Sequence, residues 1–205
     1  MLTGSGRHFC AGNDLSEFVT LAPANAAGRM LEVREAFFAI MDAPIPVIGA
    51  VHGAALGTGL AIAASCDFVV AAAGATFGLP EVGVGVMGGA RHLARLVPEP
   101  LLRSMYFTAD PVSAEELLAV GGIVAVVEPD RLLDEALARA ARIARHSSAA
   151  LHSAKRSLNA IESMDVKPGY EFEQSLTGEL SASPDAKEAL LSVIERREPR
   201  FSDRS

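Results

Sequence analysis

Two glycine-bearing turns place backbone amides where they could hold a carbonyl oxygen. The turns read Cys10-Ala11-Gly12-Asn13-Asp14 and Leu56-Gly57-Thr58-Gly59-Leu60. Each leads into a stretch with helical character, where the first amides have no intrahelical acceptor and the helix dipole adds positive potential. Two such turns brought together would stabilise an oxyanion formed on a carbonyl. On spacing alone, both could equally be ordinary helix-entry turns.

Glu81 is a candidate acid or base. It lies in the run FGLPEVGVG at residues 77–85, so its sequence neighbours are almost wholly apolar. Desolvation by such neighbours raises the pKa of a carboxyl group towards the range that suits general acid–base catalysis. The alternative is a loop carboxylate whose side chain lies in water.

His92 is a candidate second acid or base, because it follows this loop and imidazole titrates near neutral pH. Its alternative role is to cap or line a helix face. We interpret His52 and Cys66 as structural residues, the cysteine as a small core side chain.

Composition excludes several classes of function. The 205 residues carry a formal charge of −7 and no basic tract, which argues against nucleic-acid binding. Apolar runs are broken every few residues by Gly, Pro or charge, so no membrane span is expected. Two cysteines are too few for a metal cluster or a disulfide framework, and we expect a reducing cytoplasm. Neither glycine turn has the Gly-Lys-Ser/Thr or the third glycine of a nucleotide-phosphate cradle.

The elements that must position these residues follow from apolar patterning. Up to about residue 122 the chain is rich in Gly and in short β-branched runs, and beyond it Ala, Leu, Glu and Arg recur at helical spacing. We predict strands at 46–51, 67–72, 75–78 and 123–127, and helices at 15–21 (capped by Asp14), 26–41, 58–65, 90–96 and 100–108. A capping box at 113–116 begins another helix, Asp130 caps one that runs to about 145, and further helices cover 148–163, 170–181 and 184–197, the last capped by Ser183.

The chain start reads like the end of a strand, because residues 1–7 pass directly into a glycine turn. We therefore expect a preceding N-terminal segment to be missing; the alternative is a short disordered start.

Three motifs in order resemble the signatures of the enoyl-CoA hydratase/isomerase (crotonase) superfamily. They are FCAGNDL at 9–15, PVIGAVHGAALGTG at 46–59 and ATFGLPE at 75–81. The helical tail, with its segments at 154–156 and 172–173, is also similar to the family's C-terminal region. The family's opening segment has no counterpart, which agrees with the expected truncation.

The resemblance implies a fold and a set of site residues. It implies an α/β crotonase (ClpP/crotonase-like) spiral of ββα turns over 1–129, followed by a helical oligomerisation region over 130–205. The amides of Asn13 and Thr58 match the two oxyanion-hole donors, and Glu81 matches one catalytic glutamate. The implied substrate-binding residues are Cys10, Ala11, Gly12, Asp14, Gly57, Gly59 and Pro80. We expect the walls of the acyl pocket to come from Phe18, Leu21, Met30 and the loop at 84–87. The implied substrate is an acyl-CoA thioester, with coenzyme A part of the substrate and no metal or other cofactor, and the implied assembly is a homotrimer or a hexamer.

The sequence departs from the family at Ala61. Family hydratases read Gly-Gly-Gly-Cys-Glu-Leu where this chain reads Gly57-Thr58-Gly59-Leu60-Ala61-Ile62, so the first catalytic carboxylate is missing. Hydration uses two carboxylates to hold and activate one water, whereas moving a double bond needs one group that takes and returns a proton. A single carboxylate therefore favours isomerisation. The alternatives are a ring-opening C–C hydrolase of a cyclic keto-acyl-CoA, since 77–82 and 92–98 look similar to such members, and a non-catalytic acyl-CoA-binding paralogue.

Overall fold

The computed structural model describes residues 1–202, which form two compact units. The first comprises Met1–Met41 and Val47–Ala138, and the second comprises Asp42–Pro46 and the chain from Arg139 onward.

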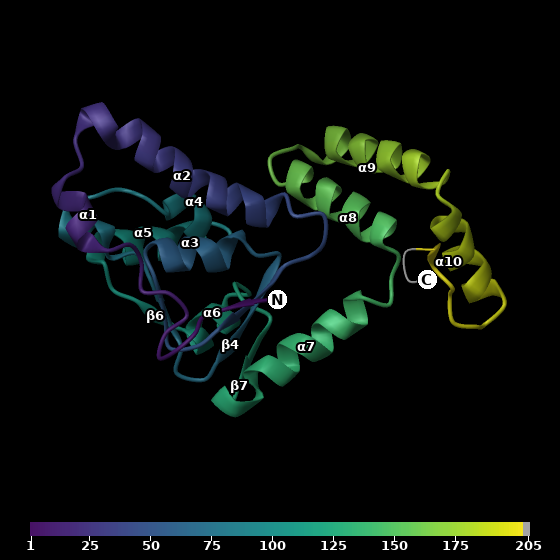
Figure 1. Cartoon of the computed structure of the whole chain (residues 1–205), viewed down its shortest axis with the longest axis horizontal. Coiled ribbons are helices and arrows are strands. Elements are labelled where there is room, and N and C mark those ends of the chain that lie inside the picture. Colours follow the sequence, from purple (N-terminus) through teal and green to yellow (C-terminus); the bar gives the residue numbers. More distant parts are fainter. Residues whose placement is uncertain (203–205) are drawn as a thin grey trace. The chain divides into compact units, whose positions relative to one another are not determined.

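Two small sheets organise the first unit (Figure 1). One sheet is wholly parallel, in the order β1 (Leu2–Thr3), β2 (Ile48–Val51), β4 (Phe68–Ala72), β7 (Ala125–Val127). The other has the order β3 (Ala54–Leu56), β5 (Thr76–Gly78), β6 (Val112–Ser113), with β5 and β6 antiparallel. The chain passes from β2 to β3 and from β4 to β5, so the strands from β2 to β5 alternate between the sheets. This is the predicted spiral of strand–strand–helix turns.

The central strands are continuous apolar runs because both of their faces are buried. Every residue of β2 is buried, as are four of the five residues of β4. The helix between β3 and β4, α3 (Thr58–Ser65), is also buried nearly all round, and its Ala and Gly residues let neighbouring elements approach closely. Phe77, Leu79 and Leu93 complete this core.

Five more helices lie in the first unit. They are α1 (Leu15–Val19), α2 (Pro23–Met41), α4 (Ala90–Leu93), α5 (Glu99–Thr108) and α6 (Ala114–Ala119), with a 3-10 turn η1 at Pro80–Val84. Both α2 and α4 pack against α3 (Figure 1). The Asp14 cap and the Ser113 capping box are confirmed, since Asp14 accepts from the Ser16 amide and Ser113 exchanges hydrogen bonds with Glu116.

The rest of the chain is helical. It contains η2 (Pro129–Arg131), α7 (Leu132–Ile143), α8 (Ser148–Ile161), α9 (Val166–Leu180) and α10 (Pro184–Ile194). In the second unit, α8 packs against α9 and α10, and the buried Lys155 donates from Nζ to the Ile45 carbonyl at 3.2 Å. Among the described residues, no helix has the length and apolar character needed to cross a membrane.

Several predicted boundaries were wrong. Asp130 does not cap a helix, because it lies inside η2 and α7 begins two residues later. Helix α9 begins at Val166 rather than at 170, since Pro168 occupies its first turn, where a missing N–H costs nothing. Helix α2 begins at Pro23 rather than at 26, and α4 and α10 end earlier than predicted. The short strands β3 and β6 were not predicted.

Candidate active site

The two glycine turns lie side by side. Cys10 forms an isolated parallel bridge with Ala55, its amide donating to the Ala54 carbonyl at 3.1 Å and its carbonyl accepting from the Leu56 amide at 3.0 Å. The first turn therefore runs alongside β3, and the residues just after each bridged segment, Asn13 and Thr58, come to one place.

Glycine is required where the turns touch. A Cβ on Gly59 would stand 2.0 Å from the Cys10 carbonyl oxygen, so only a residue without a side chain allows this approach. A Cβ on Gly12, whose φ is +102°, would stand 3.2 Å from the Leu56 carbonyl oxygen and 3.9 Å from the Thr58 nitrogen. These contacts place the first turn directly against the start of α3.

The amides of Asn13 and Thr58 are available as donors. Within residues 1–202 neither amide donates a hydrogen bond. Thr58 is the first residue of α3, so its amide has no intrahelical acceptor and lies in the positive field of the helix N-terminus. Both residues line the same cavity as Glu81.

This cavity has a volume of about 220 Å³ and lies within the first unit. Most of its wall is apolar. The apolar side chains are those of Phe18, Met30, Val33, Phe37, Ala61, Val86 and Met87. Its polar and charged residues are Asn13, Thr58, Arg34, Glu81 and His92.

The Glu81 carboxylate is set up for proton transfer. Burial raises its pKa, opposed only in part by the residue's own amide. Its Oε2 is buried and has no hydrogen-bond partner within the described chain. Its Oε1 lies against Gly57, where a Cβ would stand 2.9 Å away. A raised pKa and an unsatisfied oxygen suit a group that takes a proton from a substrate and returns it.

Ala61 lines this cavity three residues after Thr58 on α3. The position of the missing carboxylate thus faces the space beside Glu81, and a methyl group stands there.

His92 lies in the same cavity. Burial lowers its pKa, and the charges of Arg95 and Arg91 lower it further, which favours the neutral imidazole. Its ring meets the Phe37 ring edge-on, with centroids 4.7 Å apart. The geometry therefore brings the candidate second acid or base near the first.

The other predicted substrate-binding residues divide into two groups. Gly57 lines the cavity, whereas Cys10, Ala11, Gly12, Asp14, Gly59 and Pro80 do not. Cys10, Gly12 and Gly59 act in the structure by holding the turns together, and Asp14 caps α1, a hydrogen bond that lowers its pKa. Their contacts with coenzyme A remain predictions.

Five residues of the cavity wall were not predicted: Val33, Arg34, Phe37, Gly88 and Gly89. The apolar spacing of Met30, Val33 and Phe37 indicates one helix face, but nothing in the sequence says that this face meets the glycine turns. Predicted wall residues Phe18 and Met30 do line the cavity, and Leu21 lines an adjoining one of about 250 Å³.

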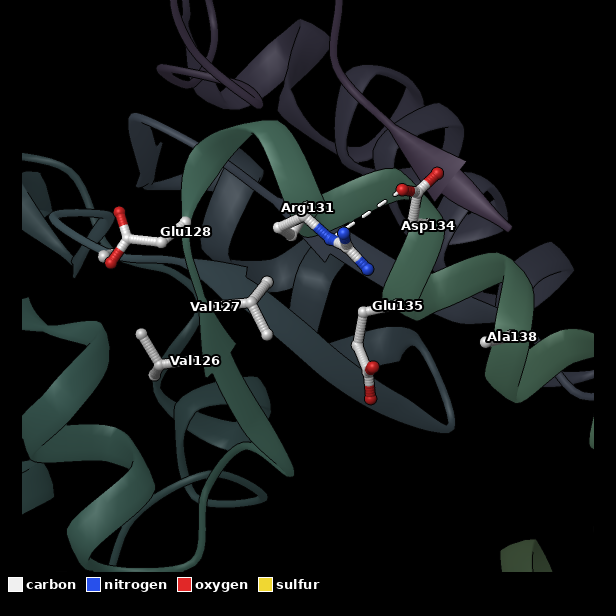
Figure 2. A pocket seen from close by; sticks show the side chains of 8 residues that line it. Val126, Val127, Glu128, Arg131, Asp134, Glu135 and Ala138 are labelled. Atoms are coloured by element: carbon white, nitrogen blue, oxygen red, sulfur yellow. Dashed lines mark ion pairs between the residues drawn. The ribbon is translucent and has the colours of Figure 1, made fainter.

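A larger cavity, of about 530 Å³, lies between β7 and the start of α7. Figure 2 shows its charged rim, where Arg131 pairs with Asp134 at 3.8 Å and both side chains are largely exposed. Its lining includes none of Asn13, Thr58 and Glu81, so the smaller cavity is the candidate site. Among residues 1–202, no group of three or more His, Cys, Asp or Glu side chains is placed to hold a metal ion.

Comparison with known proteins agrees with this geometry. A family model described as enoyl-CoA hydratase/isomerase matches residues 1–204. The chain belongs to the enoyl-CoA hydratase/isomerase family. It is therefore an enzyme of a family that acts on acyl-CoA thioesters.

Relatives in the enoyl-CoA hydratase/isomerase family carry different activities in their names. The chain is 36% identical over 204 residues to the (7aS)-7a-methyl-1,5-dioxo-2,3,5,6,7,7a-hexahydro-1H-indene-carboxyl-CoA hydrolase of Rhodococcus jostii, covering 98% of this chain and 78% of the relative. It is 35% identical over 208 residues to the 2,3-dehydroadipyl-CoA hydratase of Escherichia coli, covering 100% and 80%. The crystal structure of an enoyl-CoA hydratase subunit from Geobacillus kaustophilus superposes with a TM-score of 0.88 at 34% identity, covering 98% of this chain and 79% of that one.

Proposed function

We propose that this protein moves a double bond within an acyl-CoA by proton transfer at a single carboxylate, Glu81, while the amides of Asn13 and Thr58 hold the enolate. The observation that carries the proposal is the pairing of Glu81 with Ala61. One cavity contains a carboxylate whose buried Oε2 has no hydrogen-bond partner within the described chain and, where family hydratases have a second carboxylate, a methyl group.

The reaction needs one group that works in both directions. With a 3-enoyl-CoA, the Glu81 carboxylate removes a proton from the α carbon, and the electron pair moves onto the thioester oxygen. The two amides donate to that oxygen and stabilise the dienolate. Protonated Glu81 then returns the proton to the γ carbon, which leaves a 2-enoyl-CoA. The raised pKa makes the Glu81 carboxylate a stronger base for the first proton transfer.

Fast hydration is not expected at this site. One group must hold and activate the water, and another must deliver a proton to the α carbon. The methyl group of Ala61 can do neither. Loss of one of two acid–base groups costs on the order of 10²–10⁴ in rate. Among the described residues, the other acid–base group in the cavity is His92, whose pKa is lowered by burial, and it is our candidate for residual water activation.

A second candidate is ring-opening C–C hydrolysis, favoured by the similarity to the Rhodococcus jostii hydrolase. In that reaction Glu81 would take a proton from a water molecule while the water oxygen adds to the carbonyl carbon of a ring ketone. The C–C bond to the α carbon then breaks, giving a carboxylic acid and an enolate held by Asn13 and Thr58. The enolate takes up the proton. This route also needs only one carboxylate.

We further propose a homotrimer or a pair of trimers that needs no cofactor beyond the coenzyme A brought by the substrate. Support for self-association comes from large apolar side chains exposed on the C-terminal helices, such as Leu158, Val166, Tyr170, Val193 and Ile194. Light scattering after size exclusion tests this against the 21.4 kDa chain.

Product analysis separates the candidates. The purified protein is incubated in heavy water with a 3-enoyl-CoA, a 2-enoyl-CoA or a cyclic keto-acyl-CoA. The products are identified by mass spectrometry. Double-bond migration with deuterium uptake supports the isomerase. Ring opening supports the second candidate, and fast water addition contradicts the role assigned to Ala61. Tight binding with no turnover indicates a non-catalytic acyl-CoA-binding protein.

A further inference from the structure

Within the part of the chain that the structure describes, Arg34 is the one charged residue of the cavity wall that the proposed function does not use. It comes from α2, whose residues Met30, Val33, Arg34 and Phe37 all line the cavity. These positions follow the i, i+3, i+4, i+7 spacing of a single helix face. Three of the four are apolar, so Arg34 interrupts an otherwise apolar stripe.

Arg34 also has no partner of its own. Within residues 1–202 it forms no ion pair and no hydrogen bond. Arg29, one and a half turns earlier on the same helix, shows the contrast, because its guanidinium donates to the Glu17 carbonyl at 2.8 Å. The guanidinium of Arg34 is therefore available to a ligand.

Its charge is separate from the acid–base groups. Burial accounts for the raised pKa of Glu81, and Arg91 and Arg95 supply the charges that act on His92; Arg34 contributes to neither. Its neighbours on the α2 face of the cavity are apolar, whereas the Asn13 and Thr58 amides come from the two glycine turns. Arg34 therefore lies among the apolar residues that would hold the acyl group.

We propose that Arg34 binds a carboxylate at the far end of the acyl group, so that the substrate is the CoA thioester of a dicarboxylic acid. This inference rests on the proposed function, which puts the thioester at Asn13 and Thr58. A guanidinium matches a carboxylate with two parallel hydrogen bonds, a geometry that an ammonium or a neutral oxygen does not reproduce. The apolar walls from Phe18, Val33 and Met87 suit the methylene chain between the two ends.

Because the cavity is partly open to solvent, its volume of about 220 Å³ does not fix the length of this acyl group, which is found with a series of thioesters. Hexanedioyl-CoA is the central member of the test series, which extends from butanedioyl-CoA to octanedioyl-CoA.

Binding is measured by calorimetry, because it needs no turnover. For each length, the diacid thioester is compared with its methyl ester and with the plain acyl-CoA, using the whole chain and the variants Arg34→Met, Arg34→Lys and Arg103→Met. Arg103 is the matched control for loss of one positive charge, since it is exposed and pairs with Glu99 on α5, outside the cavity. We expect the wild type to prefer the diacid of one length by about tenfold over its methyl ester. Arg34→Met should abolish the preference, Arg34→Lys should reduce it, and Arg103→Met should leave it unchanged.

Three results overturn the proposal. One is the absence of a diacid preference at every length; another is a preference that survives in Arg34→Met. The third is an equal weakening of diacid and methyl ester in both Arg34 variants, which would make Arg34 a structural residue. If Arg34→Met fails to fold, Arg34→Lys alone decides between the last two. Since none of these readouts requires catalysis, failure of the isomerase proposal would appear separately, as an absence of turnover with the binding preference intact.

Discussion

Oε1 of Glu81 lies so close to Gly57 that a Cβ on that glycine would stand 2.9 Å from it. The amide of Gly57 is fixed to the Gly78 carbonyl at 2.9 Å, and its φ of +57° turns the chain from β3 into α3. One glycine therefore joins three features: it packs against the acid–base carboxylate, ties β3 to β5 and presents the Thr58 amide.

Replacing Gly57 by Ala should damage both stability and catalysis. The methyl group must displace the Glu81 carboxylate, and the positive φ strains any residue with a Cβ. We expect a lower melting temperature. We also expect kcat to fall by about tenfold or more, because a misplaced catalytic group slows the reaction. Gly28→Ala is the matched control: Gly28 is helical with open space around it, so the change should stabilise the fold by about 0.5–1 kcal/mol. Unaltered kcat in Gly57→Ala would show that Glu81 is not held by this contact.

Glu81→Gln should change how stability depends on pH. Burial raises the pKa of Glu81, so between the ordinary glutamate pKa and the raised one the folded protein holds a proton that the unfolded chain has released. The free energy of unfolding therefore falls as pH rises through this window, and glutamine has no such loss. We expect the melting temperature of the variant to rise relative to that of the wild type as pH increases above the ordinary glutamate pKa, and the difference to become constant once the raised pKa is passed.

The exposed Glu115→Gln serves as the control for that series. A difference between Glu81→Gln and the wild type that stays constant with pH would contradict a raised pKa.

Ala61→Glu should restore hydration. It places a second carboxylate in the cavity that already holds Glu81, which creates the pair that activates a water. We expect the rate of water addition to a 2-enoyl-CoA to rise at least tenfold. The reaction is measured by the loss of absorbance of the conjugated thioester. Overpacking at this buried position should cost about 1–3 kcal/mol of stability.

Ala61→Gln separates chemistry from bulk, because it has a similar size and no acid–base function. Equal hydration rates in the two variants would mean that the missing carboxylate does not explain slow hydration.

Much of the scaffold could be predicted because local signals agree with the tertiary structure. The helix Thr58–Ser65 has the predicted bounds, since Gly57 supplies its turn and the residues after it are small and apolar. Strands β2 and β4 follow from continuous apolar runs, and the Asp14 and Ser113 caps follow from side-chain chemistry.

The rest depends on contacts distant in sequence. Strand β3 is only three residues long and forms because the Cys10 turn and β5 pair with it on either side. Its segment Ala54–Leu56 carries no strand pattern of its own. That Asn13, Thr58 and Glu81 lie in one cavity could be inferred from the family resemblance. The role of Arg34 could not, because helical periodicity does not indicate what a helix face meets.

The most direct test of a single-carboxylate site is the exchange of α hydrogens on a saturated acyl-CoA in heavy water. Proton NMR follows hexanoyl-CoA and hexanedioyl-CoA with the wild type and with Glu81→Gln, and calorimetry checks that each still binds. We predict exchange by the wild type and a rate lower by about 10²–10⁴ in Glu81→Gln, with thioester binding retained. Exchange at an undiminished rate in Glu81→Gln would show that another group moves the proton and would contradict the account.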